Sequence, residues 1–159
     1  MKKNVLSKIT PLFLCLLALV MVSCGGDDEA LNDNVSMLYG DTWSFSKAVV
    51  DINGTQIPMS LSDIRKIYKN ELGMSNVMFV DQYLRFDENY MTLVNAGEKV
   101  KYMYYANGSL WLEGLDEINN TGEISFDVKI SSLTSTQLVF HYVIGVSGMT
   151  IYEDLYYTR

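Results

Sequence analysis

Ile124-Ser-Phe-Asp-Val-Lys-Ile-Ser131 alternates between apolar and polar side chains along its whole length. Successive side chains of a β-strand point to opposite faces of the sheet, so this stretch predicts a strand with one dry face and one wet face. Such a strand is typical of an antiparallel sheet that covers a core on one side only. The stretch therefore favours an all-β fold.

Segments of the same kind lie at short intervals along the rest of the chain. Asn, Gly, Asp, Ser and Thr dominate the connections between them, and these residues suit tight turns. No crossover helix separates the later segments, so we expect antiparallel neighbours in sequence order. We predict eight strands, at 42–52, 77–86, 90–95, 99–105, 109–112, 123–132, 137–145 and 150–158, with a shorter returning segment at 55–59 after the turn at Asn53-Gly54.

The segment 60–72 has the periodicity of a helix. Ile64 and Tyr68 belong to its apolar stripe, and Ser60 with Asp63 has the spacing of a capping box. The chain is thus predicted to form an eight-stranded antiparallel up-and-down barrel with one short helix after the first strand. A water-soluble barrel or sandwich fits better than a membrane barrel, because no repeated apolar band with aromatic girdles is present.

Residues 1–23 have the composition of a secretory signal. A basic start precedes the almost wholly apolar run 9–22, which is shorter than the about 20 residues that a membrane span needs. Val22 and Ser23 are small and directly precede Cys24. This set resembles a bacterial lipobox, which implies cleavage before Cys24 and a diacylglycerol anchor on its thiol. The alternatives are an ordinary signal with an incidental cysteine, and an uncleaved anchor.

An acidic tether is expected at 24–36, before a barrel domain at 37–159. Asp27, Asp28 and Glu29 follow the cysteine within a few positions, which resembles the surface-export signal of Bacteroidetes lipoproteins. The resemblance implies a lipid-anchored outer-membrane protein that faces the cell surface. A periplasmic location is the alternative, because any solvated linker can be acidic.

Charge and cysteine content restrict the partners of the domain. The chain has a net charge of −7 at pH 7, and an acidic protein of the cell surface is a poor nucleic-acid binder, because phosphate contacts need clustered Lys and Arg. Cys15 would leave with the signal and Cys24 would be acylated, so we expect no disulfide and no cysteine-based metal site. We expect a monomer that contacts the membrane through its lipid anchor and binds no nucleic acid.

Both ends of the predicted barrel resemble the lipocalin-like lipoproteins of Bacteroidetes. Gly40-Asp-Thr-Trp43 opens the first strand, and Tyr156-Tyr-Thr-Arg159 ends the last one. The lipocalin motif is Gly-x-Trp, and this chain has one additional residue between Gly40 and Trp43. The resemblance implies that a cation–π contact between Trp43 and Arg159 closes the barrel base. The alternative is a core Trp43 beside a frayed Arg159.

Few side chains could carry catalysis. His141 is the only histidine, and strand alternation points it away from Phe140. Glu153 and Asp154 are neighbours on a strand and therefore point to opposite faces, so they cannot easily share a metal ion or a proton. No phosphate loop, nucleophile elbow or zinc-protease motif is present. We expect no enzymatic activity, no cofactor and no metal site.

Aromatic side chains indicate function better than the catalytic candidates do. Those on one face of the predicted strands could line a pocket with apolar rings and hydroxyl tips. The residues expected to line it are Phe86, Tyr102, Tyr104, Phe126, Phe140 and Tyr142. We expect a binding protein that carries a small apolar or amphipathic ligand in its barrel, with the helix at 60–72 plugging or gating one end. The alternative is a filled barrel that serves as a scaffold for protein or glycan contacts.

Overall fold

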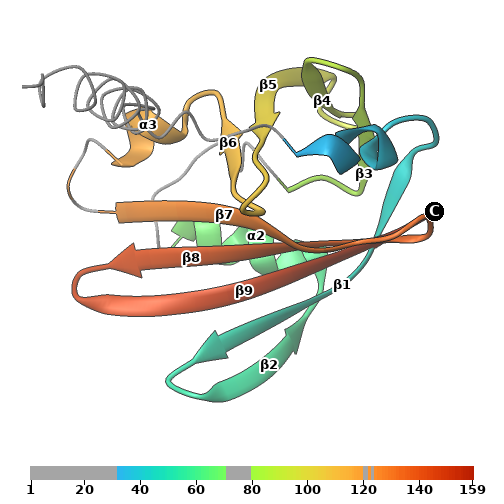
Figure 1. Ribbon diagram of the computed structural model, residues 1–159. Coiled ribbons are helices and arrows are strands. Elements are labelled where there is room, and N and C mark those ends of the chain that lie inside the picture. Colours follow the sequence, from blue (N-terminus) through green and yellow to red (C-terminus); the bar gives the residue numbers. More distant parts are fainter. Residues whose placement is uncertain (1–31, 71–79, 120–121, 123) are drawn as a thin grey trace, which may run out of the picture.

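The computed structural model describes residues 32–70, 80–119, 122 and 124–159 (Figure 1). Over these residues, nine strands form one antiparallel sheet: β1 (Trp43–Ile52), β2 (Thr55–Met59), β3 (Tyr83–Phe86), β4 (Tyr90–Leu93), β5 (Glu98–Tyr104), β6 (Leu110–Leu112), β7 (Ile124–Leu133), β8 (Gln137–Val146) and β9 (Met149–Thr158). The described helices are the 3-10 helix η2 (Asp33–Leu38), α2 (Leu61–Asn70) and α3 (Leu115–Asn119).

Eight of the strands follow one another around a nearly closed barrel. Hydrogen-bonded neighbours run in the order β6-β5-β4-β3-β1-β9-β8-β7. The two ends of this order, β6 and β7, meet at a bridge between Ser109 and Lys129 and at a 2.8 Å hydrogen bond from the Ile130 N–H to the Gly108 carbonyl. The predicted all-β barrel of eight antiparallel strands is confirmed.

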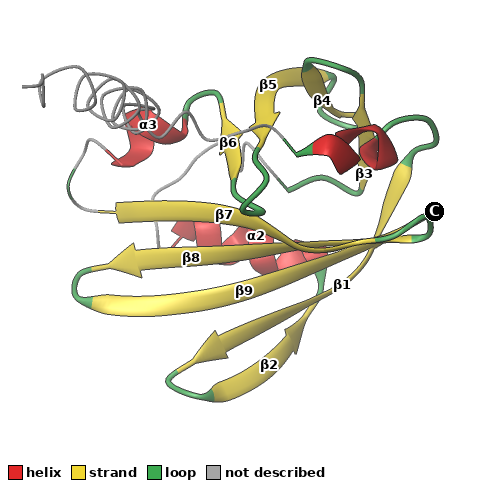
Figure 2. Cartoon of the chain, in the orientation of Figure 1, coloured by secondary structure: helices red, strands yellow, loops and turns green. Residues whose placement is uncertain are grey.

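β1 changes partners along one of its edges. Its start pairs with β3 at Trp43 and Ser44, whereas its second half pairs with β2, as the sequence predicts for the returning segment. Asn53 and Gly54 join β1 to β2 with φ angles of 55° and 82°, which suit a tight hairpin turn. α2 lies behind β7–β9 in Figure 2, and its Ile64 and Tyr68 line a cavity together with Val50 and Ile52 from the second half of β1.

The alternation in β7 sorts its side chains as expected. Phe126, Val128 and Ile130 are buried in the core, while the polar residues between them are exposed. The same inward alternation in the neighbouring strands fills the barrel with apolar side chains. Burial of this core is the main source of stability in a chain of this size.

α2 begins as the capping-box spacing predicts. The Asp63 N–H donates to Ser60 Oγ at 3.2 Å, and the Ser60 hydroxyl donates to Asp63 Oδ2 at 2.6 Å. Ile64 and Tyr68 are the buried residues of the helix. The described helix ends at Asn70, so the last two positions of the predicted helix lie outside the described residues.

The strand predicted at 77–86 is too long in its described part, because β3 starts only at Tyr83. The buried Asp81 is the physical reason. Its Oδ2 accepts hydrogen bonds from the N–H groups of Asn95 and Ala96, at 2.7 and 3.2 Å. The chain before β3 therefore caps the β4–β5 turn with a side chain, while its Gln82 carbonyl still accepts a hydrogen bond from the Phe45 N–H of β1 at 2.8 Å. Positions 77–79 lie outside the described residues.

The connection predicted over 114–122 contains the short helix α3, which sequence reasoning missed. The side chain of its last residue, Asn119, bonds the backbone of β7 in the way that a neighbouring strand would. Asn119 Oδ1 accepts from the Phe126 N–H at 2.6 Å, and its Nδ2 donates to the Phe126 carbonyl at 3.1 Å. This side-chain pairing holds α3 against β7.

The tether predicted at 24–36 overlaps the first described helix. η2 begins at Asp33, and its N-cap Asn32 accepts a hydrogen bond from the Asn34 N–H at 2.9 Å. The rest of the tether and the signal, including Cys24 and the acidic triplet 27–29, lie outside the described residues. Among the described helices, none is long and apolar enough to span a membrane.

Candidate functional site

The contact expected at the barrel base is present. The Arg159 guanidinium carbon lies 4.2 Å from the centroid of the Trp43 ring. The same guanidinium donates to the carbonyls of Tyr39 and Met37, at 2.8 and 3.0 Å, and the Trp43 indole donates to the Leu38 carbonyl at 2.9 Å. Because these donors are used within the chain, the base acts as a structural closure.

The six aromatic residues expected to line a ligand pocket all lie inside the barrel and are at most 7% exposed: Phe86, Tyr102, Tyr104, Phe126, Phe140 and Tyr142. Five of the rings, those of Phe86, Tyr102, Phe126, Phe140 and Tyr142, pack on one another. The Phe86 centroid is 5.4 Å from that of Tyr102, and the Phe126 centroid is 5.5 Å from that of Tyr142. None of the six lines either of the two cavities described below, so their contact with a ligand stays a prediction.

A small cavity lies between α2 and the inner side of the sheet. Six aliphatic and two polar side chains line it: Val50, Ile52, Ile64, Ile67, Ile144 and Ile151, with Tyr68 and Glu153. They come from α2 and from β1, β8 and β9. The cavity volume is about 30 Å³, which is enough for one water-sized group.

Glu153 is the unusual member of this lining, because it is a carboxylic acid that is only 2% exposed. Its Oε2 accepts a hydrogen bond from the Tyr68 hydroxyl. Its Oε1 is buried and has no hydrogen-bond partner among the described residues. A buried acceptor without a partner is destabilising by about 1–3 kcal/mol. Such a group calls for an explanation, which in native proteins is a bound water or ion, local strain, or a binding or catalytic role.

Burial raises the pKa of Glu153 to about 7, the Tyr68 hydrogen bond opposes this rise, and the Asp154 charge adds to it. Burial and the Glu153 charge in turn raise the pKa of Tyr68 well above its ordinary value. Tyr68 therefore stays a neutral donor near neutral pH. Arg65, on the same helix, forms its ion pair with Asp81 at 3.3 Å.

Asp81 is the other buried carboxylate of the described chain, and its surroundings differ. Besides Arg65 and the turn amides, it accepts a hydrogen bond from the Gln82 N–H at 2.6 Å. Its oxygens are thus fully used in joining α2 to the β4–β5 turn. Glu153, in contrast, has a carboxylate oxygen that accepts no hydrogen bond from the described residues.

The position of Glu153 follows from strand alternation in β9. Ile151, Glu153, Leu155 and Tyr157 share the inward face. Sequence reasoning missed this site because it considered Glu153 only as a neighbour of Asp154. The signal was available, since a Glu whose second neighbours on the strand are apolar is predicted to face the core. The expected divergence of Glu153 and Asp154 is confirmed.

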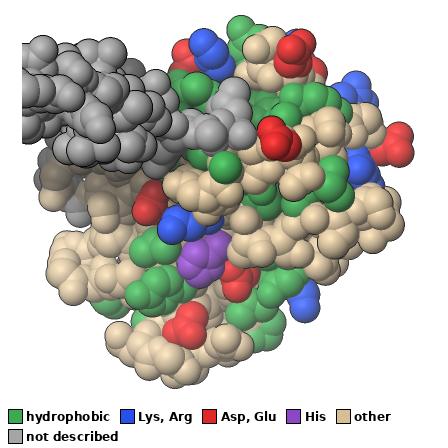
Figure 3. Space-filling model, in the orientation of Figure 1, with side chains coloured by type: hydrophobic (Ala, Val, Ile, Leu, Met, Phe, Trp, Pro, Cys, Tyr) green, Lys and Arg blue, Asp and Glu red, His purple; other side chains and the backbone are tan. Residues whose placement is uncertain are grey.

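His141 lies on the outer face of the β7–β9 sheet, as predicted (Figure 3). Its Nδ1 is 2.7 Å from Asp154 Oδ1, and its ring stacks on Tyr152 with centroids 6.0 Å apart. In the described part of the chain, no group of three His, Cys, Asp or Glu side chains is placed to hold a metal ion. Neither cavity reaches this surface pair, so it is the weaker candidate site.

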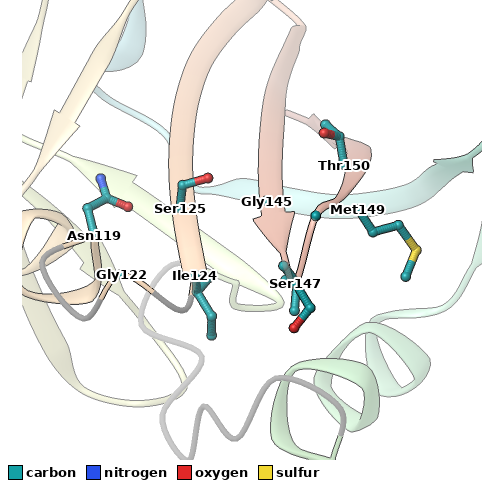
Figure 4. Close-up of a pocket in the computed structure, with 10 residues that line it drawn as sticks. Asn119, Gly122, Ile124, Ser125, Gly145, Ser147, Met149 and Thr150 are labelled. Atoms are coloured by element: carbon teal, nitrogen blue, oxygen red, sulfur yellow. The ribbon is translucent and has the colours of Figure 1, made fainter.

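A larger open hollow of about 780 Å³ lies at the β8–β9 turn and is lined by Asn119, Gly122, Ile124, Ser125, Gly145, Val146, Ser147, Gly148, Met149 and Thr150 (Figure 4). A Cβ at Gly145 would come within 2.4 Å of Ser125 Oγ, so glycine lets the serine side chain lie across β8. The Asn119 amide already bonds the Phe126 backbone. None of the described side chains that line the hollow is a buried polar group without a partner.

No protein-family model matches the chain, and no match was found among curated proteins or solved structures. Function is therefore inferred from the geometry of the cavity beneath α2.

Proposed function

We propose that this chain is a lipid-anchored cell-envelope protein that binds a small amphipathic ligand at the end of the barrel covered by α2. One observation carries the proposal: the apolar cavity beneath α2 is lined by a buried carboxyl group with an unpartnered oxygen, Glu153 Oε1. An eight-stranded barrel is wide enough to be filled by side chains or to hold one small ligand. Trp43 closes the barrel at the start of β1, and the cavity lies at the other end of the same strand.

α2 is the element that a ligand would displace. The helix buries Ile64 and Tyr68, and Arg65 bonds the Val80 carbonyl and Asp81 at 3.3 Å each. The cavity holds only a water-sized group, so an alkyl chain enters by moving α2 outward. Burial of an eight-carbon chain contributes about 6 kcal/mol before association costs. This contribution is comparable to that of the two buried side chains that it replaces.

Octan-1-ol is a suitable probe, and because the gain from burying it is offset by the displaced side chains and by association costs, we expect calorimetry to show weak binding. Ile67→Trp fills the cavity from its half-buried edge on α2 and is expected to weaken binding roughly tenfold or more, since the bulky ring occupies the ligand position. Ile57→Trp is the matched control, because Ile57 is on β2, 38% exposed and outside the cavity. Equal weakening by both substitutions, or no binding by the native chain, would contradict the proposal.

Lipid anchoring has a test of its own. Cys24→Ala removes the thiol that would accept the acyl chains and is expected to abolish incorporation of labelled palmitate. Cys15→Ala is the matched control and should leave the labelling of the mature protein unchanged. Persistent label in Cys24→Ala would show that the anchor assignment is wrong.

A surface scaffold is the second candidate function. The packed rings in the barrel favour it, as do the exposed Tyr83, Tyr90 and Met103 on the outer face of β3–β5. A scaffold would bind its protein or glycan partner on this face and would not take up octan-1-ol. The calorimetric experiment therefore separates the two functions.

A further inference from the structure

We infer that Glu153 selects the head group of the ligand, and that the site takes an amphiphile with a protonated amine head, accepts a hydroxyl head less well, and rejects a carboxylate. This inference rests on the proposed function of the cavity beneath α2. It adds the chemical class of the ligand and the residue that recognises it.

The hydrogen-bonding positions around Glu153 call for a donor. Oε2 already accepts from the Tyr68 hydroxyl, and Oε1 is a buried acceptor with no partner among the described residues. An N–H or O–H group placed in the cavity would supply the missing bond. A carboxylate head would instead bring a second set of acceptors against Oε1, and two buried carboxylates repel each other.

The charges around Glu153 call for a cation. Tyr68 faces it from α2, Tyr142 is its register partner on β8, and Val50 is its register partner on β1. Neither tyrosine is a cation. Arg65 points its charge at Asp81. An ammonium group in the cavity would therefore lie against a carboxylate that has no cationic partner among the described side chains around it.

Two further groups complete the electrostatic surroundings. On β9 itself, Asp154 lies on the opposite face and is engaged by His141, while Tyr157 is buried and donates to the Asp81 carbonyl at 3.0 Å. Both leave the carboxyl of Glu153 free of a cationic partner. Charge-assisted hydrogen bonds between an ammonium and a carboxylate are about twice as strong as neutral ones, so an amine gains most from this site.

The remainder of the cavity specifies the body of the ligand. Its other walls are the aliphatic side chains of Val50, Ile52, Ile64, Ile67, Ile144 and Ile151. Such walls offer dispersion contacts and no further polar partner. The ligand class is therefore an alkyl amine or a related amphiphile with one cationic head and an unbranched or branched hydrocarbon body.

Three probes of equal chain length test the inference on the purified protein at pH 7.5: octylamine, octan-1-ol and octanoate. We expect octylamine to bind roughly 10- to 100-fold tighter than octanoate, with octan-1-ol between them. Octylamine can form one charge-assisted hydrogen bond with Glu153, whereas octanoate has no donor and carries a charge that Glu153 repels. Glu153→Gln should weaken octylamine roughly tenfold and change octan-1-ol less than about threefold. Glu98→Gln, on the exposed start of β5, makes the same chemical change outside the site and should change neither affinity.

The outcomes distinguish the two levels of the proposal. If octan-1-ol binds but octanoate binds as tightly as octylamine, head-group selection is wrong while the proposed function stands. The same holds if Glu153→Gln leaves the amine affinity unchanged. If none of the three probes binds to either variant, the proposed function is wrong and the inference is wrong with it.

Discussion

Replacing Trp43 with alanine is expected to lower the free energy of unfolding by about 4 kcal/mol, the usual size for a buried tryptophan. Trp43 is fully buried, carries the Arg159 guanidinium on its ring face and donates to the Leu38 carbonyl. The substitution leaves a cavity at the barrel base. It also removes the indole donor of the Leu38 carbonyl and the ring contact of the Arg159 guanidinium. Urea unfolding followed by far-UV circular dichroism measures the change.

Trp111→Ala is the matched control for this prediction. Trp111 is half-buried on β6, and its indole donates to Asp116 at 3.2 Å. Removing the Trp111 ring is expected to lower the free energy of unfolding by only about 1–2 kcal/mol, because this ring buries less apolar surface than that of Trp43. Equal effects of the two substitutions would show that the Trp43–Arg159 closure contributes nothing particular to stability.

Glu153→Gln is expected to raise the free energy of unfolding by about 3 kcal/mol at pH 8 and to change it little at pH 4.5. The folded chain holds the Glu153 proton with a pKa of about 7, against an ordinary value of 4.5. The folded state therefore binds this proton more tightly than the unfolded state. The stability that protonation adds is fully present below pH 4.5 and is lost as the pH rises through 7. The glutamine cannot ionise and does not lose it.

Urea unfolding at several pH values between 4 and 8 measures this difference between the native chain and the variant. Other titrating groups affect both proteins alike, so the difference isolates Glu153. Glu98→Gln makes the same substitution at an exposed position on β5 and is the matched control. A Glu153→Gln difference that does not change with pH, or that is no larger than the Glu98→Gln difference, would contradict the burial of the Glu153 carboxyl beneath α2.

The architecture could be predicted because it depends on local patterns. Alternation at 124–131 placed Phe126 inward, Asn53-Gly54 set the first hairpin, and Ser60 with Asp63 marked the start of α2. Each of these signals involves residues that are close in sequence. The strand order then followed from the short connections, and the structure confirms it.

The candidate site was less accessible to the same reasoning, because it depends on contacts between distant residues. Tyr68 and Glu153 meet only after α2 has crossed the inner side of β9, and the sequence does not give the angle of that crossing. The Asp81 side chain likewise caps a turn at Asn95, which is distant in the sequence. The inward direction of Glu153, in contrast, was readable from the apolar residues on the same face of its strand.

Methyl NMR of selectively labelled isoleucines, titrated with octylamine, tests whether the ligand enters beneath α2. The δ1-methyl signals of Ile64, Ile67, Ile144 and Ile151 are expected to shift together with one saturating curve, because these side chains line the cavity. Ile57, exposed on β2, should not shift. Shifts that are absent from the cavity isoleucines, or that appear equally at Ile57, would contradict a ligand site at this end of the barrel.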